Sequence, residues 1–352
     1  MDKANKALEM VFVGSPLLDI YTDCEREVLE KYGLKLDGCV RATQKHDALF
    51  EKLFMDPRSY LAPGGSALNS ARVAKWFAGH KAEVAFAGCV GCDDYEQWTK
   101  NQLVAEGVVP LFVKNSKEKT GVCACLMFDG MRSLCTRLGA AAKFSKEHLY
   151  LNNIRDKLKS ATCIFVVGYF LGHSPDVVSI LAEQCSPDQV FSLSLSSEYI
   201  CSDHSEALLK VLPRVDVLFG NETEVKAFAQ ALKRDHITTV EEAIKIVGDL
   251  PRIPTFPPRI LVVTRGSQSV LVHDGTNEVL VFKVPEDVPV VHSVGCGDAL
   301  AGAFLANYIL TRHLKSSVEV GIQAAVHVLQ VQGCNPFSKG KSNDKISLTE
   351  ET

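Results

Sequence analysis

The distribution of apolar residues along the chain is the feature that most constrains its fold. Short apolar runs such as "EMVFVG", "AEVAFAGCVG" and "RILVVT" alternate with longer segments of helical period such as "SPDVVSILAEQC" and "SEALLKVLPRV". Strands joined through helices pair in parallel, and a parallel sheet needs helices on both of its faces. The sequence therefore predicts an α/β protein with a central, mostly parallel sheet.

This alternation is interrupted between Pro110 and Leu138. Three strand-like runs follow one another there, "PLFVKN", "TGVCACLMFDG" and "MRSLCTRLG". The segments "SKEKTG" and "DGMR" between them are typical of hairpin turns. We expect a small sheet inserted into the alternating chain.

Charge and hydropathy exclude several classes of partner. The formal net charge is −4, and runs of about five or more like charges are missing, so a nucleic-acid partner is not expected. The N-terminal segment lacks the apolar central region of a secretory signal peptide. The apolar stretch "ALAGAFLANYIL" is shorter than the roughly 20 residues that a membrane span needs. The sequence predicts a soluble, intracellular protein with no membrane partner.

The 12 cysteines are spread over the whole chain. Most of them should be reduced and buried in an intracellular protein of this size. Two alternatives remain: Cys89 and Cys92 with Cys123 and Cys125 could supply four zinc ligands, or the first pair could form a redox motif. Both pairs lie in apolar, strand-like text, which favours simple burial.

The stretch Gly295-x-Gly297-Asp298 stands directly before an apolar helical segment. If a helix begins at Asp298, the N–H groups of Cys296, Gly297 and Asp298 point at one spot and form an anion site. The carboxylate could then accept a proton from an attacking hydroxyl, as phosphoryl transfer requires. An acid that only stabilises the start of a helix is the commoner reason for such a pattern.

Two further polar positions lie where ligands can approach the backbone. Gly64 and Gly65 precede a helical segment that carries Asn69, whose amide can bind a hydroxyl. Asp19 follows the first strand, at the edge where parallel sheets bind ligands, and its carboxylate can accept hydrogen bonds from two sugar hydroxyls. An ordinary glycine turn and a solvated turn acid are the alternative interpretations.

Asn221 and Glu224 are three residues apart at the start of a predicted helix, so they share a face. An amide and a carboxylate suit a hydrated Mg²⁺ and phosphate oxygens, although a capping box explains the same spacing. Arg132 lies on the hairpin insert. It is a solvated charge, or it neutralises a phosphate if the insert closes over a ligand.

The order of these motifs is more specific than any single one. The chain resembles the ribokinase, or PfkB-type, family of sugar and nucleoside kinases from about Val11 to Phe337. Within that family it is most similar to the members that phosphorylate adenosine, in segments such as "PGGSALNSARVAKW", "RSLCTRLGAA" and "LPRVDVLFGNETE". The family's motifs occur here in the family's order: Asp19, Gly64-Gly65 with Asn69, Arg132, Asn221-x-x-Glu224 and Gly295-x-Gly297-Asp298.

The resemblance implies a ribokinase-like three-layer sandwich with a small β-rich lid. Residues 1–19, 64–109 and 141–352 would form the large domain, and residues 20–63 and 110–140 the lid. It also implies ATP and Mg²⁺, and phosphorylation of adenosine at its 5′-hydroxyl. The expected state is a monomer in the cytoplasm, with the nucleus as a second location.

The resemblance assigns a role to each matching residue. Asp298 would take the hydroxyl proton, Arg132 would neutralise the phosphate, and the backbone of Gly295, Cys296 and Gly297 would hold it. The substrate-binding residues would be Ser15, Leu17, Asp19, Gly64, Gly65, Ser66, Asn69, Cys123, Leu134, Phe170 and Val294. The residues beside the ATP phosphates and Mg²⁺, none of them assigned as a direct metal ligand, would be Asn221, Glu224, Thr264, Arg265 and Gly266.

The residues before the glycine motif depart from the family's Asp-Thr-Asn. They are His292, Ser293 and Val294, and valine cannot form a hydrogen bond with a base. Ser15 likewise replaces an asparagine. Because these changes affect base recognition and leave the catalytic residues in place, two alternatives stay open. One is a kinase for another nucleoside or sugar, and the other is a catalytically silent nucleoside-binding protein.

Overall fold

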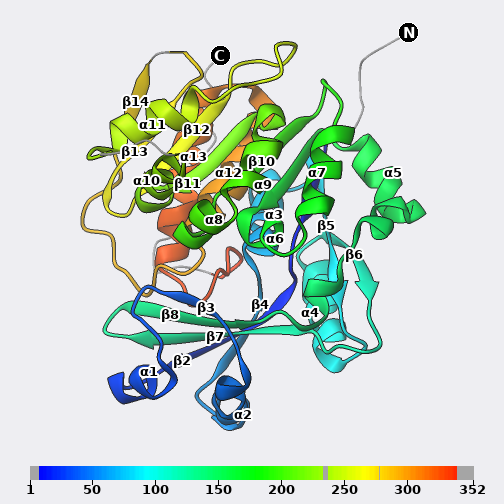
Figure 1. Cartoon of the computed structure of the whole chain (residues 1–352). Coiled ribbons are helices and arrows are strands. Elements are labelled where there is room, and N and C mark those ends of the chain that lie inside the picture. The colour runs from blue at the N-terminus through cyan, green and yellow to red at the C-terminus, as the bar shows by residue number, and fades with distance from the viewer. Residues whose placement is uncertain (1–7, 233–236, 277, 339–352) are drawn as a thin grey trace.

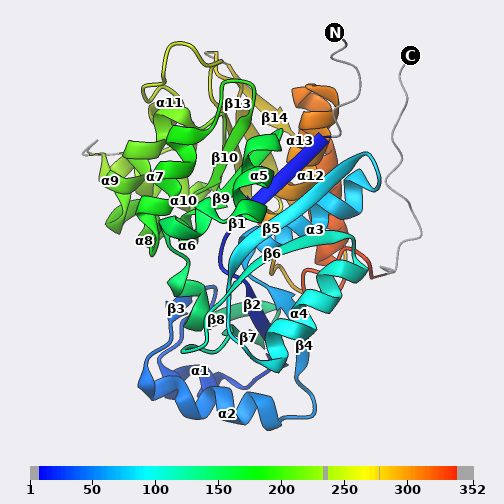
Figure 2. The same ribbon diagram turned by 90° about the vertical axis from the view of Figure 1, so that its right-hand side faces the viewer.

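Two β-sheets of unequal size form the framework of the molecule (Figures 1 and 2). The computed structural model describes residues 8–232, 237–276 and 278–338. The larger sheet has nine strands and the smaller has five. This confirms the predicted ribokinase-like α/β architecture.

The nine-stranded sheet is parallel over most of its width. Every neighbouring pair from β6 across to β12 is parallel, and β13 and β14 continue the sheet as antiparallel strands. Its strands, in spatial order, are β14 (Val279–Phe282), β13 (Gln268–His273), β12 (Ile260–Arg265), β11 (Val217–Asn221), β10 (Val190–Ser194), β9 (Cys163–Val167), β1 (Leu8–Val13), β5 (Ala82–Val90) and β6 (Val108–Lys114).

Helices cover both faces of this sheet, as Figure 2 shows. The apolar strands are buried on both sides, which is why they read as continuous hydrophobic runs. One face carries α3 (Ser66–Ala78), α4 (Asp94–Ala105), α12 (Cys296–Thr311) and α13 (Leu314–Leu329). The other carries α6 (Gly168–Leu171), α7 (Pro175–Gln184), α8 (Glu198–Asp203), α9 (Ser205–Val211), α10 (Glu222–Ala231) and α11 (Val240–Gly248), and α5 (Asn152–Ser160) precedes β9.

The five-stranded sheet separates an outer apolar core from the inner face. Alternate residues of β2 point to opposite sides, so Leu18 and Ile20 pack under the two outer helices while Leu17 and Tyr21 face the large sheet. The strands, in spatial order, are β3 (Cys39–Arg41), β8 (Met131–Arg137), β7 (Gly121–Phe128), β2 (Leu17–Asp23) and β4 (Tyr60–Gly64). The outer helices are α1 (Arg26–Tyr32) and α2 (Asp47–Met55).

The strand β6 lies in the large sheet, although it was predicted as part of the insert. It pairs in parallel with β5 over Val84–Val90 because α4 returns the chain across the sheet in a β–α–β crossover. Only β7 and β8 of the interval 110–140 belong to the small sheet. The small sheet also takes in the whole of β2, so the predicted boundary at residue 19 falls within a strand.

The cysteines do not form the predicted alternatives of a four-thiol zinc site or a redox pair. All 12 lie in the described residues as free thiols. Cys89 lies near the end of β5 in the large sheet and Cys92 follows that strand, whereas Cys123 and Cys125 lie on β7 in the small sheet. Burial raises the pKa of the Cys89 thiol to about 11, whereas an activated redox thiol has a lowered pKa.

Among the described helices, none has the length and hydropathy to cross a membrane.

Candidate active site

A cavity of about 930 Å³ is lined by both sheets. The large sheet contributes the carboxyl ends of its parallel strands, which is where open α/β sheets bind ligands, and the small sheet contributes its inner face. Predicted site residues that line the cavity are Ser15, Leu17, Asp19, Gly65, Ser66, Asn69, Cys123, Arg132, Leu134, Asn221, Glu224, Thr264, Gly266, Val294, Gly295, Cys296, Gly297 and Asp298. The structure therefore brings most of the predicted set to one place.

The glycine motif forms the N-terminal end of α12. Gly295 is the N-cap, with φ of +82°, a left-handed conformation that glycine adopts without strain. A Cβ atom there would lie 2.6 Å from the Cβ of Cys334, whereas a Cβ at Gly297 would meet nothing. The helix begins at Cys296, two residues before the predicted start. Asp298 and the free N–H groups of the first turn thus open onto the cavity.

Asp298 is half-buried and paired with a residue of another helix. The Nδ2 atom of Asn69 on α3 donates a hydrogen bond to its Oδ2 at 2.9 Å. The two helices approach closely because Gly302 of α12 lies against the backbone of Ser70. Burial raises the pKa of Asp298 to about 6, and hydrogen bonds from Asn69 and Ser66 oppose that rise. A carboxylate with this pKa is ionised near neutral pH and is basic enough to accept a proton.

Asp19 lies deeper in the cavity, on β2. Its carboxyl group is buried and accepts a hydrogen bond of 3.3 Å from the hydroxyl of Tyr21. Burial raises its pKa to about 7, the Tyr21 hydrogen bond lowers it, and the charge of Asp298 adds to the rise. Gly64, on the neighbouring strand β4, makes room for this carboxyl group, because a Cβ there would lie 1.9 Å from Oδ1 of Asp19.

Arg132 connects the small sheet to the loop before α12. Its guanidinium group, on β8, donates a hydrogen bond to the hydroxyl of Ser293 at 3.1 Å. It contributes a positive charge to the environments of Asp298 and Glu224, whose pKa values it lowers. Arg132 is half-buried and lines the cavity, so it is not simply a solvated charge, and its role at a phosphate stays a prediction.

Asn221 and Glu224 form a capping box and also line the cavity. The Oδ1 of Asn221 accepts from the backbone N–H of Glu224, and Oε2 of Glu224 accepts from the backbone N–H of Asn221. The capping-box interpretation is therefore confirmed, whereas a role beside Mg²⁺ and phosphate stays a prediction. Burial raises the pKa of Glu224 to about 7, and the hydrogen bond from Asn221 partly offsets this rise. Thr264 and Gly266 lie at the neighbouring β12–β13 turn.

Three predicted residues do not line the cavity. Gly64 acts through the space that it leaves for Asp19. Phe170 is fully buried against Phe144 and His173, and the adjacent Tyr169 lines the cavity instead. Arg265 points away and donates to the carbonyl of Ser269.

Several lining residues were missed because they carry no local signal. These residues are Cys39, Arg41, Cys125, Thr136 and Tyr169. Cys39 and Arg41 lie on a three-residue edge strand whose placement depends on its pairing with β8. Tyr169 lies in the single helical turn after β9, so strand alternation could not tell its side from that of Phe170. Tyr199, in the first turn of α8, also lines the cavity.

The residues that depart from the family pattern have definite packing roles. His292 stacks on Tyr21 with a centroid separation of 5.6 Å, and its Nε2 accepts a hydrogen bond from the backbone N–H of Gly333. Val294 belongs to the apolar cluster under the small sheet. The hydroxyl of Ser15 lies 2.8 Å from Nε2 of His173. The apolar and hydroxyl groups here replace amides at the cavity wall.

This arrangement can remove a proton from a hydroxyl group and stabilise an anion beside it. Asp298 is placed where it could serve as the base, beside the positive potential of the start of α12 and of Arg132. Asp19 and Asn69 carry polar groups that could bind hydroxyls. The fold and the site together define a phosphotransferase that acts on an alcohol.

Comparison with known proteins identifies the family. The family model described as pfkB family carbohydrate kinase matches residues 27–339. The chain is 32% identical over 349 residues to the adenosine kinase of Saccharomyces cerevisiae, covering 97% of this chain and 99% of that protein. It is 31% identical to the adenosine kinase of Schizophyllum commune, covering 91% and 94%.

The structural comparison agrees. The crystal structure of Anopheles gambiae adenosine kinase in complex with P1,P4-di(adenosine-5) tetraphosphate superposes with a TM-score of 0.88 at 31% identity, covering 96% of this chain and 100% of that one. The chain belongs to the pfkB family of carbohydrate kinases.

Proposed function

We propose that this protein transfers the γ-phosphoryl group of ATP to the 5′-hydroxyl of adenosine, releasing AMP and ADP. The observation that carries the proposal is the pairing of Asp298 with Asn69 at the start of α12, inside a cavity that also contains Asp19 and Arg132. Curated relatives that match almost the whole chain are adenosine kinases, which favours adenosine over a sugar or a silent binding role.

The small-sheet side of the cavity would bind the nucleoside. The carboxylate of Asp19 and the amide of Asn69 can bind the ribose hydroxyls, and the backbone of Gly65 can approach them closely. Leu17, Leu134 and Val294 offer apolar surface to the base. Tyr169 and Tyr199, whose ring centroids are 6.3 Å apart, extend that wall.

The chemical step needs one proton transfer and one phosphoryl transfer. Asp298 accepts the proton of the 5′-hydroxyl. At the same time the hydroxyl oxygen bonds to the γ-phosphorus, and the bond between the γ-phosphorus and the bridging β-phosphate oxygen breaks. The backbone N–H groups of Cys296 and Gly297 and the guanidinium group of Arg132 would stabilise the negative charge of the transferring group.

A hydrated Mg²⁺ fits the donor set beside α10. Oδ1 of Asn221 and Oε2 of Glu224 are engaged in the capping box, and Oε1 of Glu224 accepts from Nδ2 of Asn221. Each carboxylate oxygen has a further lone pair that could accept from water. These two residues would hold the ion through its water shell, and Mg²⁺ neutralises phosphate charge when it is bound.

We further propose that the protein is a monomer that works in the cytoplasm, with the nucleus as a second location.

The decisive experiment separates a base from a helix-stabilising acid. Asp298→Asn should lower kcat by about 10²–10⁴-fold, since general bases contribute this much, while calorimetry should still detect adenosine binding. Asp176→Asn is the matched control, because Asp176 is an exposed first-turn acid of α7. It should leave kcat unchanged. A loss of less than tenfold for Asp298→Asn would overturn the assignment of the base.

A nucleoside panel tests the substrate. We expect kcat/KM to be greatest for adenosine when inosine, guanosine and ribose are compared at fixed MgATP. Greater kcat/KM for ribose would refute an adenosine kinase. Nucleoside binding without any turnover would refute catalysis altogether.

A further inference from the structure

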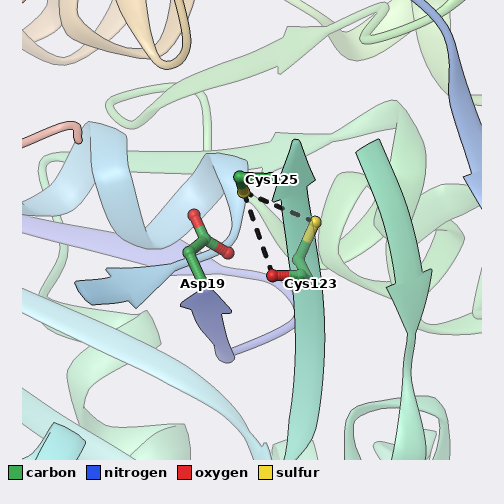
Figure 3. A group of neighbouring side chains, drawn as sticks. All are labelled: Asp19, Cys123 and Cys125. Atoms are coloured by element: carbon green, nitrogen blue, oxygen red, sulfur yellow. Dashed lines mark hydrogen bonds between the residues drawn. The ribbon is translucent and has the colours of Figure 1, made fainter. Parts of the chain in front are cut away.

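One group of side chains in the cavity has a chemistry that phosphoryl transfer does not use. Figure 3 shows Asp19 of β2 beside Cys123 and Cys125 of β7. One ligand atom of each, a carboxylate oxygen and two sulfurs, lies within 4.8 Å of the other two. All three side chains are buried, and all three residues line the cavity.

The sheet register explains why these groups meet. β2 and β7 are parallel neighbours, with Asp19 opposite Cys123 and Tyr21 opposite Cys125. Cys123 and Cys125 are two residues apart on one strand, so both point to the inner face. The arrangement is therefore fixed by backbone pairing and does not depend on a loop.

The spacing of the two sulfurs suits a tetrahedral metal ion. The Sγ atoms of Cys123 and Cys125 are 3.9 Å apart. Two thiolates on one tetrahedral Zn²⁺ are roughly 3.8 Å apart, as follows from a Zn–S distance of about 2.3 Å. The hydroxyl of Thr136 donates to Sγ of Cys123 at 3.2 Å, which stabilises negative charge on that sulfur.

We propose that Asp19, Cys123 and Cys125 form a site for a thiophilic divalent cation such as Zn²⁺, which binds in place of the nucleoside. Two sulfurs and one carboxylate favour a borderline or soft ion and disfavour Mg²⁺. The three protein ligands leave a fourth position open to the cavity, where water completes the tetrahedron.

Competition with the nucleoside follows from the shared carboxylate. In the proposed function Asp19 accepts hydrogen bonds from ribose, and a cation on the same oxygens removes that acceptor. This part of the inference rests on the proposed function, whereas binding of the cation does not. A kinase of this kind would be inhibited by free zinc at its nucleoside site.

The test uses the full-length protein, freed of metal by a chelator and without nucleotide. Zn²⁺ alone is titrated against a chromophoric zinc indicator, and proton release is recorded. We expect one ion per chain and release of about two protons, because thiols must deprotonate to coordinate zinc. Adenosine should lower the apparent zinc affinity in proportion to its concentration.

Variants identify the ligands. Cys125→Ser and Cys125→Ala should each lower zinc affinity at least tenfold, and circular dichroism checks that they fold. Cys92→Ser is the matched control, because Cys92 is an exposed thiol outside the cavity. It should bind zinc as the wild type does.

Two results would overturn the inference. Equal zinc binding by the wild type and by a Cys123→Ser/Cys125→Ser double variant would show that the ion lies elsewhere. Zinc binding that depends on the two thiols but is insensitive to adenosine would refute the shared site. Neither readout requires turnover, so failure of the kinase reaction would be recognised separately.

Discussion

Asp298 should set the acid side of the pH profile. Burial raises its pKa to about 6, and only the deprotonated form can accept the hydroxyl proton. We therefore expect kcat/KM for adenosine to rise with pH through the interval of about 6–7, because Asp19 and Glu224 also titrate there with pKa values of about 7. It should level off about one pH unit above these pKa values.

The profile is measured with adenosine below KM and MgATP saturating. The facing cation is Arg132, whose charge lowers the pKa of Asp298. An acid limb whose midpoint lies near pH 4, the ordinary range of aspartate, would contradict a buried base.

Gly64 should matter for substrate affinity although it does not line the cavity. In Gly64→Ala the new Cβ would lie 1.9 Å from Oδ1 of Asp19, so the carboxyl group must move. We expect KM for adenosine to rise about tenfold or more, equivalent to about 1.4 kcal/mol of binding, with KM for ATP little changed. Steady-state kinetics with each substrate varied in turn measures both values.

A matched variant separates this effect from the general cost of replacing a glycine. Gly79→Ala strains a left-handed residue at the end of α3, where an added Cβ meets nothing. It should lower stability and leave KM for adenosine unchanged. The same increase in KM for both variants would refute the role of Gly64 in positioning Asp19.

At the scale of elements, the crossing of α3 and α12 holds the catalytic pair together. Gly302 allows it, because a Cβ there would lie 2.3 Å from the backbone oxygen of Ser70. Gly302→Ala should lower the free energy of unfolding by about 1–3 kcal/mol. It should also lower kcat, because the helices that carry Asn69 and Asp298 must separate.

Denaturant unfolding and kinetics on the same preparation test this coupling. Unchanged kcat with reduced stability would mean that the hydrogen bond between Asn69 and Asp298 tolerates the separation. The ability of Asp298 to accept a proton would then not depend on the close crossing of α3 and α12.

Some secondary-structure elements could be predicted from the sequence, and others could not. The alternating pattern predicts the parallel sheet correctly, and the Gly295-x-Gly297 motif predicts the turn that presents Asp298, since both signals are local. The partner of β6 is set by a crossover that no local pattern encodes, so its placement with the hairpin was wrong. Which of Tyr169 and Phe170 faces the cavity is decided by a single helical turn, and a segment that short has no periodicity from which to predict it.

At the scale of the whole molecule, the small sheet should act as a lid on the large one. The hydrogen bond between Arg132 and Ser293 joins the β7–β8 hairpin to the loop before α12. We expect adenosine to protect residues 121–137 from hydrogen exchange, because closure would exclude water from the cavity. Hydrogen-exchange mass spectrometry with and without adenosine measures this protection.

The strand β6 and the helix α11 are internal references for the same experiment. Both belong to the large sheet and its cover, so their exchange should not change. Equal protection of β6 and the hairpin would indicate global stabilisation and would count against a moving lid.

The first two strands give the molecule an unusual order of assembly. β1 lies inside the large sheet and β2 inside the small one, and only Gly14, Ser15 and Pro16 join them. The partners of β1 are β5 and β9, and β9 begins at Cys163. In a chain emerging from the ribosome, β5 is complete at Val90, but the other edge of β1 stays unpaired until β9 is made, when nearly half of the protein has been synthesised. Such distant pairing slows folding and leaves a strand edge transiently unpaired.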